Sequence, residues 1–455
     1  MQDELKPCAL VILAAGQGTR MNSDRAKVLH QIGSAPLVAH AIHAGASLDP
    51  ARIVIVTGHQ ADAVEMAIAA QCPEAVCVRQ GELLGTGHAV LQAATALKGF
   101  EGDVIVLYGD TPFIRPQTLQ AMRAARAHHD IVMLGFEAVD PGRYGRLIMD
   151  GNRLTRIVEA KDATPAEQEI TLCNSGLLCA DAATLMPLLA EVGNDNASGE
   201  YYLTDVPQIA AKKGLSATAV TCREAETLGI NTRAELADAE RLFQTARRSE
   251  MQENGATMVA PETVFFALDT WIGRDVMIEP HVVFGPGVTV ENDVTIRAFS
   301  HLEGCHLGAR ATVGPYARLR PGAEIGNDAR VGNFVEVKAA EIGEGAKVNH
   351  LTYIGDAGIG ARSNIGAGTI TCNYDGVFKH RTEVGADVFV GSNTMLVAPV
   401  TLGDGAMTGS GSVITKDVPA GDLAIARAKQ TNKAGLGARL MARLRALKDQ
   451  RKKER

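Results

Sequence analysis

The loop Gly16-Gln-Gly-Thr-Arg-Met21 directly follows an apolar run, Cys8–Ala15. Its two glycines leave backbone N–H groups open to a phosphate chain, and Arg20 adds a positive charge. The chemistry that this arrangement predicts is the binding of nucleotide phosphates. A loop with two glycines is also typical of a tight turn between a strand and a helix, so the loop by itself is compatible with either interpretation.

A second set of reactive side chains lies between residues 318 and 374. Arg320 and Lys338 are eighteen residues apart and could hold a phosphate together if the chain repeats at that distance. His350 offers an imidazole, which is suited to take a proton near neutral pH. A histidine followed three residues later by Tyr353 is also compatible with a plain surface pair.

The element that must position this second set is a repeat of six residues between Ile272 and Ile414. An apolar residue recurs at this period through twenty-four hexads, and no α-helix repeats at six. Each short strand must stack on the next coil to bury its side chain. The pattern resembles the left-handed parallel β-helix of hexapeptide-repeat acyltransferases, in which three hexads form one coil. The same repeat would suit a rigid spacer or an oligomerisation device, so the chemistry depends on residues outside the repeat.

The first half of the chain, from residue 8 to about residue 230, alternates apolar runs with helical stretches. This is the α/β pattern of a mostly parallel, Rossmann-like sheet, which binds ligands at the carboxyl ends of its strands. A further helix over 232–250 is predicted between the two halves. Strands are predicted at 8–15, 52–56, 104–108 and 175–179, and helices at 35–46, 88–98, 115–127 and 202–211.

The motif Leu13-Ala-Ala-Gly-x-Gly-Thr-Arg-Met, followed by Lys27-Val-Leu, resembles the signature of sugar-1-phosphate nucleotidylyltransferases. That signature often has proline where this chain has Ala26, a difference that concerns loop stiffness more than chemistry. Further segments follow in the order of the uridylyltransferase members: Gln80, Gly85-Thr-Gly-His, Tyr108-Gly-Asp110, Tyr144-Gly-Arg, Ile157-Val-Glu159, Asn174-Ser-Gly and Gly229-Ile-Asn231.

The resemblance implies roles for residues of the first half. Arg20 and Lys27 would spread the charge that builds on pyrophosphate as a sugar phosphate attacks the α-phosphorus of UTP. Asp110 and Asn231 would bind Mg²⁺, which suits a small number of hard oxygen ligands. Nucleotide and sugar would be held by Leu13, Ala14, Ala15, Gly16, Lys27, Gln80, Gly85, Thr86, Tyr108, Gly109, Asp110, Gly145, Glu159, Asn174 and Asn231.

Segments of the second half resemble the acetyltransferase half of the bacterial bifunctional N-acetylglucosamine-1-phosphate uridylyltransferases / glucosamine-1-phosphate N-acetyltransferases. The resemblance covers nearly the whole chain, and implies that His350 is the base. Glucosamine 1-phosphate would be bound by Arg320, Lys338, Tyr353 and Asn364, and acetyl-CoA by Ala367, Asn373, Tyr374, Ser392, Ser410 and Arg427. Members of this family assemble as homotrimers in which neighbouring β-helices build the site together, and we expect the same assembly here.

These observations predict a bifunctional enzyme. Acetyl-CoA acetylates glucosamine 1-phosphate in the second half, and the first half then transfers a uridylyl group from UTP, giving UDP-N-acetylglucosamine and pyrophosphate. The resemblance further implies that this product supplies peptidoglycan and lipopolysaccharide synthesis in bacteria. The predicted parts are a uridylyltransferase domain (1–230), a linker helix (231–250), a left-handed β-helix acetyltransferase domain (251–425) and a basic tail (426–455).

Two other hypotheses compete with this one. In the first, the chain is a nucleotidylyltransferase with one activity, whose β-helix only oligomerises or binds an effector; His350, Arg320 and Lys338 argue against it. In the second, the chain is a regulatory or scaffold subunit that has lost both chemistries. The intact Lys27 and Asp110 argue against that hypothesis.

Composition is consistent with a soluble globular protein, at 46% hydrophobic and 21% charged residues. Eight cysteines without a Cys-x-x-Cys pair suggest reduced thiols in a cytosol, and we expect a cytoplasmic protein. The apolar run at Cys8–Ala15 follows a net acidic leader and precedes a glycine loop, so it is predicted as a buried strand rather than a signal peptide. No stretch approaches the roughly eighteen apolar residues of a membrane span.

The C-terminal tail is strongly basic. Residues 427–455 contain eleven Lys and Arg against Asp449 and Glu454, so the tail has a net charge of +9. Because the whole chain has a net charge of −7, the rest of the chain has a net charge of −16. Such a tail can bind nucleic acid or anionic lipid. A solvated amphipathic end is the favoured interpretation, and we expect no nucleic-acid partner; its apolar side would carry Leu436, Leu440, Leu444 and Leu447.

Overall fold

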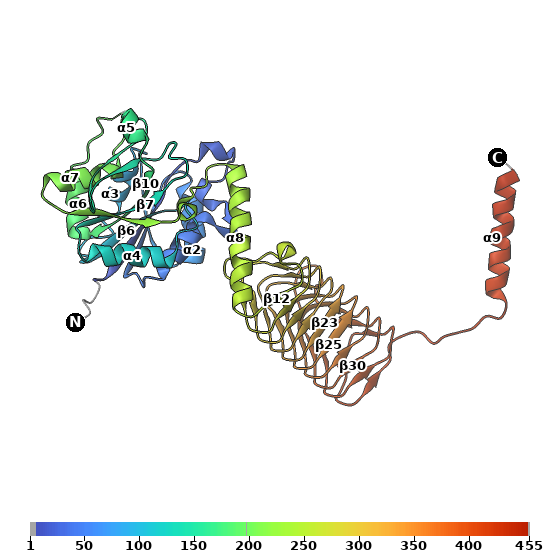
Figure 1. Cartoon of the computed structure of the whole chain (residues 1–455). Helices are drawn as coiled ribbons and strands as arrows, with labels where there is room; N and C mark the ends of the chain where they lie inside the picture. The colour runs from blue at the N-terminus through green and yellow to red at the C-terminus, as the bar shows by residue number, and fades with distance from the viewer. Residues whose placement is uncertain (1–5, 197, 454–455) are drawn as a thin grey trace. The chain divides into compact units, whose positions relative to one another are not determined.

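The computed structural model describes residues 6–196 and 198–453 of the chain, which form two compact units (Figure 1). The first unit extends to Met251 and also includes Phe265–Thr270. The second comprises Gln252–Val264 and the chain from Trp271 onward.

A mixed nine-stranded sheet is the centre of the first unit, with the main order β11-β7-β10-β6-β1-β4-β5. β10 runs antiparallel to β6 and β7, and the other neighbours on this path are parallel. The predicted Rossmann-like sheet is therefore confirmed, with β10 and the β8–β9 hairpin as its antiparallel parts. The strands are β1 (Cys8–Ala14), β4 (Arg52–Thr57), β5 (Val76–Arg79), β6 (Asp103–Tyr108), β7 (Ile131–Glu137), β8 (Arg146–Asp150), β9 (Arg153–Val158), β10 (Leu172–Asp181) and β11 (Ala217–Cys222).

Helices lie between most of these strands, close to the predicted places. The helix predicted at 35–46 begins later, because Ala35–Pro36 forms the short strand β3 with β2 (Gln31–Ile32). The helix predicted at 88–98 ends at Gln92, and the chain continues in turns. The helices are α1 (Leu37–Ala46), α2 (Ala61–Gln71), α3 (Thr86–Gln92), α4 (Pro116–Arg126), α5 (Pro165–Gln168), α6 (Ala182–Ala190), α7 (Val206–Lys212) and α8 (Arg233–Glu253).

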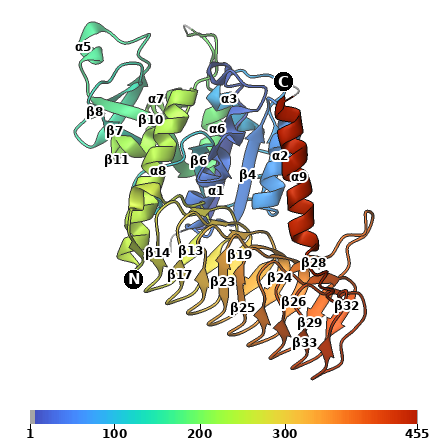
Figure 2. The same ribbon diagram turned by 90° about the vertical axis from the view of Figure 1, so that its right-hand side faces the viewer.

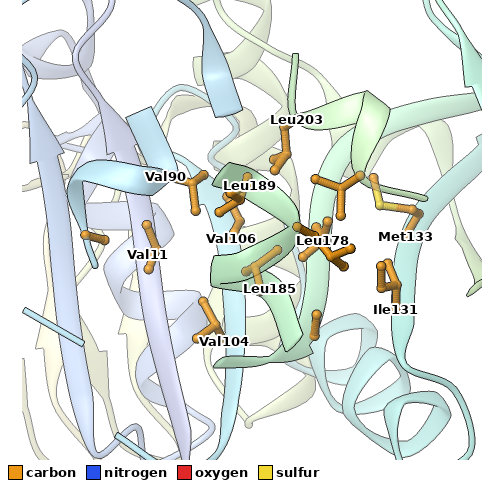
Figure 3. Packing of buried hydrophobic residues seen from close by; sticks show 14 of the residues in the cluster. Val11, Val90, Val104, Val106, Ile131, Met133, Leu178, Leu185, Leu189 and Leu203 are labelled. Atoms are coloured by element: carbon orange, nitrogen blue, oxygen red, sulfur yellow. The ribbon is translucent and has the colours of Figure 1, made fainter. Parts of the chain in front are cut away.

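Both faces of this sheet are buried, as the alternation along β1 shows. Val11 belongs to a core shared with α3, α6 and α7 (Figure 3), whereas Leu10 and Ile12 belong to a second core shared with α1, α2 and α4. Near-continuous apolar strands are expected when helices cover both faces of a parallel sheet. Because the faces are filled, a ligand must bind at the ends of the strands.

The second unit is a parallel β-helix with three faces, and its strands stack coil on coil (Figure 2). The position that the hexad pattern predicts to be buried, from Ile272 to Ile414, is buried in every hexad, including the two where it is a threonine, Thr371 and Thr408. The predicted left-handed β-helix of hexapeptide repeats is thus confirmed. β24 and β26 are long strands that turn from one face to the next, so two of the three faces join in one sheet.

We name the three faces A, B and C. Face A contains β12 (Thr257–Met258), β14 (Met277–Ile278), β17 (Thr295–Ile296), β20 (Thr312–Val313), β23 (Arg330–Asn333), β25 (Lys347–His350), β27 (Asn364–Ile365), β30 (Phe389–Val390), β33 (Met407–Thr408) and β35 (Leu423–Ala424). Face B contains β15 (Val283–Phe284), β18 (His301–Leu302), β21 (Arg318–Leu319), the starts of β24 (Glu336–Ile342) and β26 (Tyr353–Ile359), β28 (Ile370–Cys372), β31 (Met395–Val397) and β34 (Val413–Ile414). Face C contains β13 (Trp271–Ile272), β16 (Thr289–Val290), β19 (Cys305–Leu307), β22 (Ala323–Ile325), the ends of β24 and β26, β29 (Thr382–Val384) and β32 (Val400–Leu402).

The corner between faces A and B, here called the A–B corner, carries an exposed aromatic ladder. It consists of His281, Phe299, Tyr316 and Phe334, whose ring centroids are 4.8, 5.0 and 5.1 Å apart in successive pairs. Phe334 remains 55% exposed despite this stacking. The ladder is therefore an apolar strip along one edge of the unit.

The basic tail forms α9 (Leu436–Lys453). Leu440, Leu444 and Leu447 are exposed at 51%, 59% and 46%. Among the described residues, no helix is long and apolar enough to cross a membrane.

Two candidate active sites

The loop after β1 and the end of β6 border a cavity of about 290 Å³ in the first unit. Leu13 and Tyr108 are neighbours in the parallel β1–β6 ladder, and the Gly109 N–H donates to the Leu13 carbonyl at 2.9 Å. The two segments thus meet at the carboxyl edge of the sheet, where α/β folds bind ligands. Most residues predicted to bind uridine and phosphates line the cavity, namely Leu13, Ala15, Gly16, Lys27, Gln80, Gly85, Thr86, Tyr108 and Asp110.

Three side chains meet beside this cavity: Lys27 and Asp110 line it, and Asn231 contacts Lys27. The Lys27 ammonium forms an ion pair with the Asp110 carboxylate and lies 3.1 Å from Asn231 Oδ1. The Ile230 N–H donates to the Asp110 carbonyl at 3.0 Å, which keeps the segment before α8 beside the end of β6. Side-chain exposure is only 13% for Lys27 and 19% for Asp110, so both charges are partly shielded from water. Residues from three distant parts of the sequence therefore bring an ammonium group and two side-chain oxygens together.

The Gly85 turn fixes the other side of the cavity. Gly85 has a positive φ of 109°, and a Cβ there would come within 2.7 Å of the Tyr201 carbonyl, so a side chain does not fit. Gln80 is buried, and its Nε2 lies 3.3 Å from the Gly85 carbonyl and 3.0 Å from Nδ1 of His88. Thr86 Oγ1 accepts a hydrogen bond from the Leu203 N–H at 3.1 Å. These contacts hold Gln80, Gly85 and Thr86 in place.

Three of the predicted residues have other surroundings. Ala14 is 2% exposed and lies in the core on the opposite face, so it can offer a ligand only its backbone. Arg20 is exposed on a short 3₁₀ helix, Thr19–Met21. Neither Arg20 nor Gly109 is among the residues that line the cavity.

A second cavity of about 660 Å³ adjoins the first and shares Thr86, Tyr108 and Glu200 with it. The residues predicted to hold the sugar line it: Gly145, Glu159 and Asn174. Burial raises the pKa of Glu159, and Thr204 Oγ1 donates to its carboxylate at 3.0 Å. Sequence reasoning assigned no role to Glu200, Tyr202 or Thr204, which come from a loop and a 3₁₀ turn before α7.

In the second unit, the predicted phosphate-binding residues lie on face B. Arg318 pairs with Glu336 in the β21–β24 ladder. Arg320 and Lys338 each follow these residues by two positions, so they lie side by side on neighbouring coils, as their spacing predicts. Nη1 of Arg320 lies 2.9 Å from Oε1 of Glu336. Lys379, followed by burial and Arg320, lowers the pKa of Lys338. Asp356, whose Oδ2 lies 3.9 Å from Nζ of Lys338, acts in the opposite direction and raises this pKa.

His350 ends strand β25 at the A–B corner and is exposed. It lines a cavity of about 550 Å³ together with Arg297, Arg330, Asn333 and other residues of the preceding coils. Its Nδ1 lies 2.8 Å from Oδ1 of Asn333. The imidazole is thus held by a hydrogen bond on one side and open to solvent on the other.

Residues predicted to bind the coenzyme continue from His350 along the same corner. Asn333, His350, Ala367, Ser392 and Ser410 each stand two residues after the buried residue of a face A strand, on successive coils, and we call them the corner row. Backbone hydrogen bonds of 2.7 to 3.2 Å connect each coil of the row to the next. The predicted base and three predicted coenzyme ligands thus form one continuous line.

The remaining matched residues surround this row. Arg427 donates to the Ser410 carbonyl at 2.5 Å, so the contact between these two residues uses the backbone of Ser410. Asn373 Nδ2 hydrogen-bonds Asp356 and lies 3.4 Å from the Tyr353 hydroxyl. Asn364 begins strand β27 on face A, whereas Tyr353 begins β26 on face B. The residues predicted to bind glucosamine 1-phosphate are therefore divided between two faces.

Comparisons with known proteins agree with this division into two sites. Residues 10–191 match the model of the MobA-like NTP transferase domain. Residues 269–304, 304–339 and 381–416 match the bacterial transferase hexapeptide (six repeats).

Relatives match the chain over almost its entire length. A protein named bifunctional protein GlmU from Jannaschia sp. (strain CCS1) is 69% identical over all of both chains. The chain belongs to the bifunctional GlmU family. Proteins of the same name from Ruegeria sp. (strain TM1040) and Paracoccus denitrificans (strain Pd 1222) are 65% and 61% identical over 97% of this chain and 98% and 99% of theirs.

Membership of the GlmU family confirms the predicted activities. The enzyme acetylates glucosamine 1-phosphate with acetyl-CoA and transfers a uridylyl group from UTP to N-acetylglucosamine 1-phosphate, and its two domain matches correspond to the two reactions. The product is a precursor for cell-wall and lipopolysaccharide synthesis. The hypotheses of a single activity and of a non-catalytic scaffold are both wrong.

Proposed function

We propose that uridylyl transfer takes place where Lys27, Asp110 and Asn231 converge, within the predicted domain of residues 1–230 and the linker helix that follows. The observation that carries this proposal is the contact of Lys27 Nζ with both oxygen-bearing side chains at the cavity. The nucleotide occupies the smaller cavity and the sugar phosphate the larger one, which adjoins it. Lys27, with Arg20 from the exposed loop, offsets the charge that develops on pyrophosphate during in-line attack.

Asp110 and Asn231 are the proposed ligands of Mg²⁺. A carboxylate and an amide oxygen that already meet at one point fit an ion that takes one or two protein oxygens and keeps several waters. When bound, Mg²⁺ supplies positive charge that neutralises substrate phosphates. The Lys27 ammonium contacts the same two side chains, so a cation already lies at the place where Mg²⁺ would be bound.

Acetyl transfer is assigned to the A–B corner, within residues 251–425. His350 takes the proton from the amine of glucosamine 1-phosphate as nitrogen attacks the thioester carbonyl. The C–S bond of the thioester then breaks, and coenzyme A leaves and is protonated to its free thiol. Arg320 and Lys338 bind the phosphate, and Tyr353 and Asn364 orient the sugar. Acetyl-CoA lies along the corner row past Ala367, Ser392 and Ser410, flanked by Asn373, Tyr374 and Arg427.

The proposed location of the enzyme is the cytoplasm, where its cysteines would be reduced. All eight cysteines are unpaired in the structure, consistent with that compartment. The basic tail is assigned no nucleic-acid partner.

The working enzyme is proposed to be a homotrimer. Two observations support an interface along the A–B corner: the sugar-phosphate ligands are split between faces A and B, and the aromatic ladder beside them is exposed. Face A of one copy would complete the site begun by face B of its neighbour, and the ladder would be covered.

The test of the two activities follows free thiol and pyrophosphate separately in one set of reactions. Thiol release should need only glucosamine 1-phosphate and acetyl-CoA, whereas pyrophosphate release should need UTP, Mg²⁺ and the acetylated product. A reaction without sugar phosphate corrects for the free cysteines of the protein. Pyrophosphate release from unacetylated substrate at the same rate would contradict the proposed order.

Mixed trimers provide the test of a shared site. Asn364→Ala damages face A and Lys338→Ala damages face B, and each alone should nearly abolish acetyl transfer. Refolding the two variants together should restore about a quarter of the wild-type activity, since one interface in four then joins two intact faces. Mixing Arg320→Ala with Lys338→Ala, both on face B, should restore none. Equal results from both mixtures would contradict the shared site.

A further inference from the structure

We propose that Asn333 is a positioning residue for acetyl transfer, one that fixes the tautomer and orientation of His350. Its amide oxygen accepts a hydrogen bond from Nδ1–H of the imidazole, 2.8 Å away, and so leaves Nε2 as the unprotonated nitrogen that takes the proton. The inference rests on the proposed role of His350 as the base.

The β-helix itself brings the two side chains together. Asn333 and His350 are partners in the parallel β23–β25 ladder, each two residues after a buried valine, Val331 and Val348. The Leu351 N–H donates to the Asn333 carbonyl at 3.1 Å, which holds the adjacent backbone. Side chains at matched positions of neighbouring coils stand one above the other, so the amide stacks directly against the ring edge.

The direction of the corner row shows on which side of the His350 ring Asn333 lies. From His350 the row runs toward Ala367, Ser392 and Ser410, the proposed coenzyme side, whereas Asn333 occupies the coil on the opposite side. The hydrogen bond therefore holds the ring on the side away from the proposed coenzyme ligands, and Nε2 is left for the substrates. Thr352 Oγ1 also donates to the His350 carbonyl at 2.7 Å, so the backbone of the base is held as well.

An amide and a carboxylate in this place would have different effects. Both accept a hydrogen bond from Nδ1–H, but a carboxylate also stabilises the protonated ring, whereas an amide sets the tautomer without adding charge. Arg297 and Arg330 line the same cavity as the His350 ring, and Lys347 lies on the same strand as His350.

Asn333→Ala and Asn333→Asp test the proposal in the full-length enzyme. We expect Asn333→Ala to lower kcat for acetyl transfer about tenfold with little change in KM, because a freed ring samples the wrong tautomer and orientation. Asn333→Asp should keep most of kcat and move the acidic limb of the kcat–pH profile to higher pH. The ¹⁵N shifts of His350 should show Nδ1–H in the wild type and a tautomer mixture in Asn333→Ala.

Asn327→Asp is the matched control, because it adds the same charge at an exposed asparagine after β22, outside both proposed sites. Its pH profile should equal that of the wild type, and uridylyl transfer should be unchanged in every variant. An unchanged kcat in Asn333→Ala, or an Nε2–H tautomer in the wild type, would overturn the inference. Retention of acetyl transfer by His350→Ala would instead refute the role of the base, so the two failures are distinguishable.

Discussion

Replacement of His350 by alanine is expected to lower acetyl transfer by about 10²- to 10⁴-fold, the range that a positioned general base contributes. The amine of the substrate must lose a proton as it attacks the thioester, and His350 lies in the corner row directly before the proposed coenzyme ligands. Because the ring is exposed and at a corner, its loss opens no cavity in the β-helix core. The measurement is thiol release from acetyl-CoA at saturating glucosamine 1-phosphate.

His301→Ala is the control for this variant, since it removes an exposed histidine from face B, outside the proposed site. It should acetylate at the wild-type rate. Uridylyl transfer by His350→Ala, given ready-made N-acetylglucosamine 1-phosphate, should also be normal. Acetylation by His350→Ala within a few-fold of the wild type would show that another group removes the proton.

The hexad register allowed most of the second unit to be predicted, because a period of six with a buried residue fixes the face on which every other residue lies. The same register contained the partner of His350. Asn333 is seventeen residues before it, which equals one coil because the step from Val337 to Ile342 is five residues. Adding this short step to the count would have identified Asn333 as the adjacent residue.

Lys379 could not be found in this way. It lies in the loop inserted between Thr371 and Val384, where the hexads stop and no register can be counted. Only the folded chain shows that the insertion returns to Lys338 and affects its pKa. A repeat predicts positions along its own coils and gives no information on an inserted segment.

In the first unit, apolar runs predicted β1, β4, β6 and β10, but not the direction of β10, because an apolar run does not depend on strand polarity. The loop that carries Glu200 and Tyr202 has no periodic pattern. It reaches the cavity through tertiary hydrogen bonds, such as that from the Gly87 N–H to the Tyr201 carbonyl at 2.8 Å. Such contacts join segments more than a hundred residues apart, and a local pattern cannot reveal them.

Replacement of Asp110 by alanine is expected to lower uridylyl transfer by about 10³-fold and to leave acetyl transfer unchanged. The carboxylate has two proposed tasks: it holds the Lys27 ammonium and it provides the charged ligand for Mg²⁺. Its removal leaves the partly buried Lys27 with only the neutral oxygen of Asn231, and weakens the charge that faces the phosphates. The rate is measured as pyrophosphate release from UTP and N-acetylglucosamine 1-phosphate over a series of Mg²⁺ concentrations.

Asp110→Asn separates these tasks, because it keeps the shape and one oxygen but removes the charge. We expect it to need more Mg²⁺ for half-maximal rate than the wild type and to regain part of the activity as Mg²⁺ rises, whereas Asp110→Ala regains little. Asp62→Ala, which removes a carboxylate that is 89% exposed on the same unit, should behave as the wild type.

Since Asp110 and His350 belong to different compact units, the alanine substitution at each should abolish one reaction and leave the other unchanged. Loss of both reactions from either substitution would contradict two separate sites.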